Sequence, residues 1–500
     1  MKSHSEIDGG SNSMNTNTNE NLVLITKSYP FGAVAESFLD LEIPYLSKAF
    51  DYVVILPCSL PAEIERVERK LPANIFVDIS LIREKLQRKD PREYNVAFNV
   101  GKSRYPYHEL FRRPNILLDA AISIRRAIYH LYEAFRVRNW VLRYIKQNNS
   151  DLTRTVFYTY WMAGATMGVG LAKRRYSEIK LVPRAHGWDI YEERHSPPYL
   201  PFRSPTLAPL DRLYLISEHG ESYITKKYPH IKSKLLISRL GVRATGFLSE
   251  ASADGVFRVI SCSNVVPVKR IQLIISGLKE LGLSRPDLEI EWVHIGSGPL
   301  LDKMKTYATS QLPENVTSKF LGFLPNPEGL SYYKHNPIDI FINVSASEGI
   351  PVSIMEVQGC GIPVVATAVG GTPEIVSEKV GVLIGENPSL KEITDALGIF
   401  VDHPDIAEQL RSNSVINWKS HYDADKNFTD FARALYVIYK SCTLFILSSP
   451  NSLESHDVSG LRVSNHGNFV DQGYYIHFCK IMKHILYSEI KSSISRHRLS

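Results

Sequence analysis

A chain of 500 residues, 44% hydrophobic and 22% charged, is too long for one hydrophobic core, so we expect a soluble protein with two domains. The net charge of +6 is modest and no nucleic-acid-binding motif accompanies it, so we expect no nucleic-acid partner. Five scattered cysteines without a Cys-x-x-Cys pair argue against a zinc site and against a disulfide framework, and they favour a reducing compartment. No apolar run reaches about 18 residues, as a membrane-spanning helix requires.

The chain opens with a polar leader, residues 1–20, which lacks the apolar segment of a secretory signal and is expected to be disordered. The first domain, residues 21–242, then begins with a strand, a loop, a helix and a second strand. We place these elements at Asn21–Thr26, Glu36–Phe50 and Tyr52–Pro57, with Phe38 on the apolar stripe of the helix. This order is typical of a doubly wound α/β domain, in which ligands bind where strands meet helix N-termini.

The segment Leu60–Asn149 is expected to be mostly helical, and it carries a basic cluster. From Leu81 to Lys146 we count 15 Lys and Arg against 6 Asp and Glu, interleaved with aromatic and aliphatic residues. Such a segment can lie on an anionic membrane surface, and it can equally be a pair of helices with a solvated face. The cluster includes Arg112, Arg113, Arg125, Arg126, Arg136, Arg138 and Arg143.

Further strands and a helix complete the first domain. We place the strands at Val156–Trp161, Lys180–Ala185, Arg212–Ile216 and Leu235–Ser238, and the helix at Thr166–Arg175. The sequence RAHGWD, residues 184–189, puts His186 at the end of a strand, where a doubly wound domain binds its ligand. The small and polar segment Arg243–Gly255 is the predicted linker between the domains.

The second domain, residues 256–425, restarts the alternation of strands and helices. Its expected strands are Phe257–Ser261, Glu289–Gly296, Lys319–Gly322 and 380–384, and its expected helices are Arg270–Leu281, Pro299–Leu312, Lys391–Val401 and Asp405–Trp418. A further helix at 426–440 ends the regular pattern. The tail, residues 441–500, is polar and ends in a basic stretch, so we interpret it as a poorly ordered extension, with a second membrane contact as the alternative.

The most informative stretch is FINVSASEGIPVSIMEVQGCGIPVVATAVGGTPEIV, which runs from Phe341 to Val376. Pro351 suits the first turn of a helix, whose free N–H groups and dipole favour an anion in front of it. Glu356 lies further inside this helix, where a carboxylate can accept hydrogen bonds from a ribose diol. Glu348 lies in the preceding loop and can contact a sugar. The pattern therefore predicts a site for a nucleoside diphosphate and the sugar it carries.

This stretch, with its E-x7-E spacing, the preceding Asp339 and the trailing GIPVVAT-x-VGG-x-x-E, resembles the C-terminal signature of family 4 retaining glycosyltransferases, of the glycosyl transferases group 1. The resemblance covers about Asn21–Leu435. It implies the GT-B fold, an α/β architecture in which two Rossmann-like doubly wound domains face each other across a cleft. It also implies a nucleoside-diphosphate sugar as co-substrate, with no cofactor and no metal ligands.

In the resembled family an Arg-Lys pair in a G-R-x-x-x-x-K loop binds the donor diphosphate. Here, in SCSNVVPVKR, Lys269 matches the lysine and Asn264 replaces the arginine. Asparagine can donate a hydrogen bond to one phosphate oxygen but carries no charge, so we expect Arg270 or Arg239 to supply the missing charge. The other predicted donor-binding residues are Glu356, Gly349, Ile350, Pro351, Val352, Gly298, Phe323 and Leu324.

In the first domain the resemblance assigns His186 to the donor sugar, and we predict catalytic roles for His186, Lys269 and Glu348. The predicted acceptor-side residues are Gly32, Glu36, Trp188, Asp189 and Gly371. Gly32 and Glu36 belong to the loop YPFGAVAE, in which Ala35 stands at the place of the family's second glycine. Gly370, Gly371 and Glu374 are expected to close the site from the C-terminal side.

We therefore expect a retaining, metal-independent hexosyl- or glycosyltransferase that moves a sugar from a nucleotide sugar to a glycan or lipid-linked glycan, in surface polysaccharide or lipopolysaccharide assembly. The expected location is the cytoplasm, with a peripheral contact to the anionic inner face of the cell membrane. One rival is a non-catalytic subunit that binds a sugar nucleotide or a glycan and keeps the GT-B fold. A two-domain dehydrogenase is disfavoured, because Leu301 stands where a nicotinamide-binding glycine fingerprint needs its third glycine.

Overall fold

The computed structural model describes residues 20–32, 36–60, 69–86, 105, 120–148 and 151–447. Several predictions lie outside these residues. They concern the leader up to residue 19, Ala35, Arg112, Arg113 and the tail from residue 448 onward.

A seven-stranded parallel sheet forms the centre of the first domain, with the strand order β3-β2-β1-β4-β5-β6-β7. The strands are β1 (Asn21–Thr26), β2 (Tyr52–Pro57), β3 (Ile75–Val77), β4 (Thr155–Thr159), β5 (Lys180–Ala185), β6 (Leu213–Leu215) and β7 (Leu235–Ile237). Every residue of β1 and β4 is buried, because parallel strands in α/β domains are covered on both faces.

The helices of the first domain lie along this sheet and in the loops at its ends. They are α1 (Leu39–Ala49), α2 (Ser80–Leu86), α5 (Ala120–Asn148), α6 (Gly164–Lys173), α7 (Gly187–Ile190), α8 (Arg203–Leu207) and α9 (Glu218–Lys227). Short 3-10 turns are η2 (Leu152–Arg154), η3 (Glu192–Arg194) and η4 (Pro229–Lys234). The turns α7 and η3 directly follow β5 and therefore belong to the ligand-binding edge of the sheet.

The second domain is built on a six-stranded parallel sheet with the order β10-β9-β8-β11-β12-β13. The strands are β8 (Val256–Cys262), β9 (Glu289–Ile295), β10 (Val316–Gly322), β11 (Ile340–Asn343), β12 (Val364–Thr367) and β13 (Gly381–Ile384). The helical elements are η5 (Pro267–Lys269), α10 (Ile271–Ser284), α11 (Leu301–Gln311), α12 (Asn326–His335), α13 (Val352–Gly359), α14 (Thr372–Ile375) and α15 (Leu390–Asp402). Two sheets with this order confirm the predicted pair of Rossmann-like domains.

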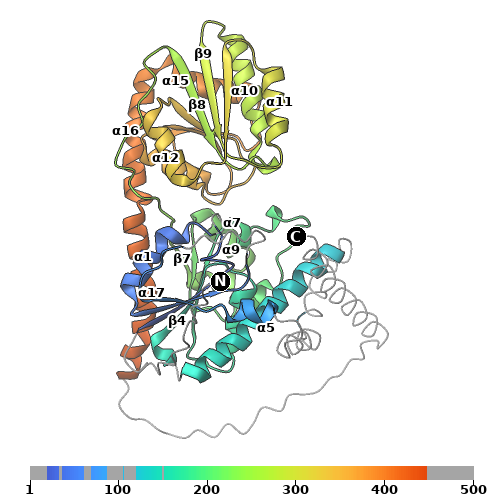
Figure 1. Cartoon of the computed structure of the whole chain (residues 1–500), viewed down its shortest axis with the longest axis vertical. Helices are drawn as coiled ribbons and strands as arrows, with labels where there is room; N and C mark the ends of the chain where they lie inside the picture. The colour runs from blue at the N-terminus through green and yellow to red at the C-terminus, as the bar shows by residue number, and fades with distance from the viewer. Residues whose placement is uncertain are drawn as a thin grey trace, which may run out of the picture.

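Two long helices run beside both domains (Figure 1). α16 (Pro404–His421) lies along the second domain, and α17 (Ala424–Leu447) returns to the first domain. The ring of Phe431 on α17 packs edge-on against Tyr158 of β4 and Tyr214 of β6, with centroid distances of 5.3 and 5.1 Å. The last helix is therefore part of the core of the first domain.

One expectation about local structure is wrong. Helix α1 begins at Leu39, so Phe38 precedes the helix and stays 43% exposed, outside the expected apolar stripe. The described part of Leu60–Asn149 is mostly helical, as expected, and it also contains the short edge strand β3. Helix α12 was not predicted, because its first residues, NPEG, combine residue types that are typical of turns, although proline also fits a first helical turn.

Three arginines of the basic cluster are bound within the first domain. Arg126 donates to the carbonyl oxygens of Pro197 and Tyr199, at 3.0 and 2.7 Å. Arg136 is buried and donates to backbone carbonyls, and Arg143 pairs with Glu84 at 2.6 Å. These contacts favour the packed helix over the membrane surface for this part of the cluster.

Candidate active site

The loops that follow β8 and β11 carry the predicted diphosphate-binding and sugar-binding residues. β8 pairs with β9 on one side and with β11 on the other, so the strand order reverses between β8 and β11. Lys269 lies in the loop after β8, and Glu348 lies in the loop after β11. The backbone N–H of Ala346 donates to the carbonyl of Val268 at 2.8 Å and ties the two loops together. Doubly wound sheets bind ligands beside such a reversal.

Lys269 and Glu348, both predicted to be catalytic, form an ion pair. The Lys269 Nζ atom lies 2.5 Å from Glu348 Oε1, and the carboxylate is buried. The side-chain amide of Asn343 approaches the same carboxylate oxygen at 3.5 Å. The structure thus brings together a cation and a carboxylate from two separate loops. The sequence predicted a role for each of the two residues, but it did not predict their ion pair.

The Gly370-Gly371 turn packs directly on the loop that carries Glu348. The N–H of Gly371 donates to the carbonyl of Gly349 at 2.8 Å. Gly370 has a φ of +54°, and a methyl group on it would overlap the carbonyl oxygen of Glu348. Only glycine fits here, so the turn can pack directly on the backbone of the loop that carries Glu348. Ile350 and Pro351 are buried between this turn and α13, which begins at Val352.

Glu356 lies on α13 and is held by a residue that sequence reasoning missed. Asn326, the first residue of α12, donates from Nδ2 to Glu356 Oε1 at 2.5 Å. Burial raises the pKa of the Glu356 carboxyl to about 7. A half-buried carboxylate with one protein donor keeps acceptor positions for further hydroxyl groups. Nothing in the sequence indicated this contact, because helix α12 was not predicted and Asn326 is its first residue.

Replacing Glu356 by glutamine is expected to stabilise the protein at pH 8. The folded-state pKa of Glu356 is raised above its ordinary value of 4.5, so the folded state is penalised as the pH rises from about 4.5 through about 7. Glutamine carries no such penalty and can still accept from Asn326. We expect a gain of about 1–3 kcal/mol at pH 8 that fades toward pH 5. Scanning calorimetry at both pH values measures it, with the exposed Glu328→Gln as control; a variant less stable than wild type at pH 8 would refute it.

The remaining predicted donor-binding residues line the second domain near these loops. A methyl group on Gly298 would lie 2.6 Å from the carbonyl oxygen of Val265, so this glycine lets the loops after β8 and β9 pack closely. Phe323 is 55% exposed, and Leu324 is half-buried against the core of the second domain. An exposed aromatic ring beside a sheet end can contact a nucleotide base.

The two arginines expected to replace the family's arginine are engaged elsewhere. Arg270 donates to the carbonyls of Val344 and Ser345, at 2.6 and 2.9 Å. Arg239 pairs with Glu218 and Glu374, at 2.6 and 3.3 Å. Arg270 thus stabilises the end of β11, and Arg239 links the two domains. Asn264 is exposed in the loop after β8, as a phosphate donor would be.

His186 directly follows β5, and its imidazole is buried. It is 7% exposed, and neither ring nitrogen has a hydrogen-bond partner among the described residues. Its ring packs against Tyr160 and Trp161, with centroids 4.6 and 4.7 Å away. Burial, and next the Arg184 charge, lower the pKa of His186 to about 3, so the imidazole is neutral. A neutral ring with two unpaired nitrogens is suited to accept from, or donate to, a sugar hydroxyl.

Asp189 does not line the acceptor side as predicted. It is buried, and its carboxylate accepts from the backbone N–H groups of His186 and Met162, at 2.6 and 2.7 Å. Its role is therefore to fix the turn that carries His186. Trp188 is 59% exposed, as an acceptor-side residue would be, and its ring lies 4.3 Å from that of His195.

Glu36 is likewise bound within the first domain. Its carboxylate accepts from the backbone N–H groups of Ser28 and Tyr29, both at 2.7 Å, and from the indole N–H of Trp161 at 2.7 Å. Because these donors use both oxygens, Glu36 stabilises the loop after β1, and the predicted role in orienting an acceptor has no support. Gly32 lies in the same loop, with a φ of +84°.

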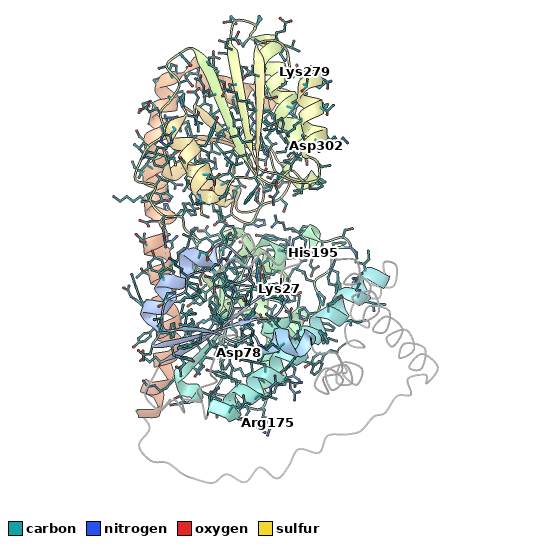
Figure 2. All side chains as sticks on the ribbon, viewed as in Figure 1. Lys27, Asp78, Arg175, His195, Lys279 and Asp302 are labelled. Carbon is teal, nitrogen blue, oxygen red and sulfur yellow. The ribbon has the colours of Figure 1, made fainter. Side chains whose placement is uncertain are left out.

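The two domains meet beside the His186 turn. A methyl group on Gly187 would lie 3.3 Å from the Cα atom of Gly349, so the two turns nearly touch. Arg194 of the first domain donates to the carbonyl of Ser347 at 3.2 Å. Glu374 accepts from the backbone N–H of His219 at 2.8 Å. His195, the neighbour of Arg194, marks this edge of the first domain in Figure 2.

Two further features of the described ranges bear on chemistry and location. In these ranges, no three His, Cys, Asp or Glu side chains gather in a way that could hold a metal ion. The described helices include none with both the length and the apolar character that crossing a membrane requires.

Comparisons with known proteins test the resemblance. Residues 247–415 match the family model for glycosyl transferases group 1. This chain carries a group 1 glycosyl transferase domain. It is 27% identical over 231 residues to WcaL of Escherichia coli K12, named as a colanic acid biosynthesis glycosyltransferase; the match covers 44% of this chain and 56% of WcaL. It is 26% identical over 253 residues to the amylovoran biosynthesis glycosyltransferase AmsK of Erwinia amylovora, covering 47% and 58%. The chain thus spans about half the length of these relatives.

Solved structures with the same architecture match more of the chain than the family model does. The lipopolysaccharide outer core galactosyltransferase WaaB superimposes with a TM-score of 0.55 at 12% identity, covering 85% of this chain and 99% of WaaB. Anabaena HepE in complex with UDP gives a TM-score of 0.54 at 15% identity, covering 83% and 100%. At these identities the likeness concerns the fold, and it confirms the predicted GT-B architecture of the chain.

Proposed function

We propose that the chain is a retaining glycosyltransferase of family 4 that moves a sugar from a nucleoside-diphosphate sugar to a glycan or lipid-linked glycan. One observation carries the proposal. Lys269 and Glu348 form an ion pair beside the N-terminus of α13, and Glu356 lies further along the same helix. A cation beside helix N–H groups, with a carboxylate at each side, supports a diphosphate site at this position. The names of WcaL and AmsK support a growing glycan as the acceptor.

In the proposed reaction the bond between the anomeric carbon and the diphosphate breaks, and negative charge builds up on the leaving diphosphate. Lys269, Asn264 and the first N–H groups of α13 stabilise this charge. The acceptor attacks from the face that the diphosphate leaves, and the diphosphate takes the acceptor proton. Glu356 holds the ribose, while Glu348 and His186 hold the sugar.

A panel of nucleotide sugars with a lipid-linked glycan fraction tests the proposal. Release of the nucleoside diphosphate should occur with one nucleotide sugar of the panel and should depend on the acceptor. NMR of the product should show that the transferred sugar keeps the anomeric configuration that it had in the donor. An inverted product would contradict retention, and no release with any donor would contradict the activity. Glu356→Gln is expected to weaken binding of the nucleoside diphosphate, although it stabilises the fold at pH 8.

A second candidate function is a non-catalytic subunit that binds a sugar nucleotide. Asn264 favours it, because an asparagine stands where the family has a charged arginine. Calorimetry separates the two: this alternative predicts nucleotide binding without turnover on any acceptor.

We also propose a cytoplasmic location with a peripheral membrane contact, since a lipid-linked acceptor lies at a bilayer. The described arginines of the basic cluster are largely bound within the domain, so this proposal depends on the cations outside the described residues. Flotation with anionic liposomes tests it: the wild type should float, and neutralising Arg112 and Arg113 should reduce flotation. If the wild-type protein did not float with the liposomes, the proposed membrane contact would be contradicted.

A further inference from the structure

The proposed diphosphate site lacks one charge, and the cations that the sequence suggested for it, Arg270 of the second domain and Arg239 of the first, do not replace it. Asn264 is neutral. Lys269 is paired with Glu348, and Arg270 donates to the backbone at the end of β11. Arg239 is held by two carboxylates, one of them Glu374. A leaving diphosphate carries more negative charge than one paired lysine can balance, so a further cation is needed.

Arg194 of the first domain lies at this site. It ends η3, and its Nη2 atom donates to the carbonyl of Ser347 at 3.2 Å, next to Glu348. A methyl group on Gly187 would overlap the Nη1 atom of Arg194 and would lie 3.3 Å from the Cα atom of Gly349. The guanidinium therefore lies between the turn after β5 and the loop that carries Glu348.

The charge of Arg194 is available to a ligand. Among the residues that the structure describes, Arg194 forms no ion pair with a carboxylate, and its polar contact is a backbone carbonyl. The side chain is half-buried, so water screens it less than a surface cation. A guanidinium is always charged, and its planar set of donors matches two phosphate oxygens. Gly187, without a side chain, leaves the space that the guanidinium occupies.

We infer that Arg194 binds the donor diphosphate from the first domain and supplies the charge that Asn264 lacks. The inference rests on the proposed function, because it assumes that a diphosphate lies beside Lys269. It adds a specific consequence: the diphosphate is held by Lys269 of one domain and Arg194 of the other, so nucleotide binding joins the two domains. On release, Arg194 stabilises the charge that develops on the leaving group.

Isothermal titration calorimetry with UDP, GDP, ADP, CDP and dTDP tests the inference, and the corresponding nucleosides serve as reference ligands. Arg194→Gln should weaken binding of the preferred diphosphate about tenfold or more, with little change for the nucleoside. Arg194→Lys, which keeps the charge, should lose less. Arg175→Gln is the matched control, because Arg175 is exposed at the end of the first domain far from the site (Figure 2).

A rescue variant separates charge from structure. Asn264→Arg in the Arg194→Gln background should recover most of the lost diphosphate affinity, since it restores a cation at the same anion; a purely structural role of Arg194 would give no recovery. Unchanged diphosphate affinity in Arg194→Gln, with the wild type binding normally, would overturn this inference and leave the proposed function standing. A wild type that binds none of the five diphosphates would overturn both.

Discussion

Replacing Lys269 by alanine is expected to lower the rate of nucleoside diphosphate release by about 10²- to 10³-fold, the usual cost of removing one preorganised donor from a developing anion. The loss has two physical sources. The substitution removes the cation nearest to the proposed diphosphate, and it leaves the buried Glu348 without the Nζ atom 2.5 Å away. An unpaired carboxylate repels the diphosphate that it now faces.

The measurement is a continuous assay of diphosphate release under saturating donor and acceptor. Lys279→Ala is the matched control, because Lys279 lies on α10, where its Nζ atom donates to Gln311 at 3.0 Å, away from the site (Figure 2). The control should keep wild-type activity. If Lys269→Ala released diphosphate as fast as the control, Lys269 would have no part in catalysis.

Replacing Arg184 by leucine is expected to destabilise the first domain by about 3–5 kcal/mol. Arg184 and Glu42 are fully buried and form an ion pair at 2.9 Å. Arg184 also donates to the carbonyl of Ser238 at 2.8 Å, and its guanidinium lies 4.4 Å from the ring centroid of Phe431 on α17. The variant leaves an uncompensated carboxylate in the core and weakens the attachment of the last helix.

Scanning calorimetry should show the first-domain transition lowered by roughly 10 °C or more. The double variant Arg184→Leu with Glu42→Leu should be more stable than Arg184→Leu alone, because it removes the buried charge as well as its partner. The exposed Arg175→Leu should change stability by less than about 0.5 kcal/mol. A single variant as stable as this control would show that the ion pair contributes nothing to the fold.

The sequence predicted the architecture well because its signals are local. Buried parallel strands are continuous apolar runs, and Asn21–Thr26, Tyr52–Pro57 and Lys180–Ala185 match the observed strands residue for residue. The stretch Phe341–Val376 was equally predictable, since Pro351 and the Gly370-Gly371 turn have backbone requirements that few other residues satisfy.

The contacts within the site could not be predicted in the same way. Spacing puts Glu36 and Asp189 in loops at the ligand-binding edge, but it does not show that backbone N–H groups occupy their carboxylates. Arg270 was likewise placed beside the diphosphate by its position next to Lys269, yet its φ of +50° directs the side chain to the end of β11. Arg194 carries no motif, because its place depends on the contact between two domains.

A structure of the chain with bound UDP or GDP is the decisive measurement. We expect the diphosphate within hydrogen-bond distance of Lys269 Nζ and of the Arg194 guanidinium, with the ribose hydroxyls on Glu356. Ligand density at any other place on the chain, with Lys269 still paired only to Glu348, would contradict it.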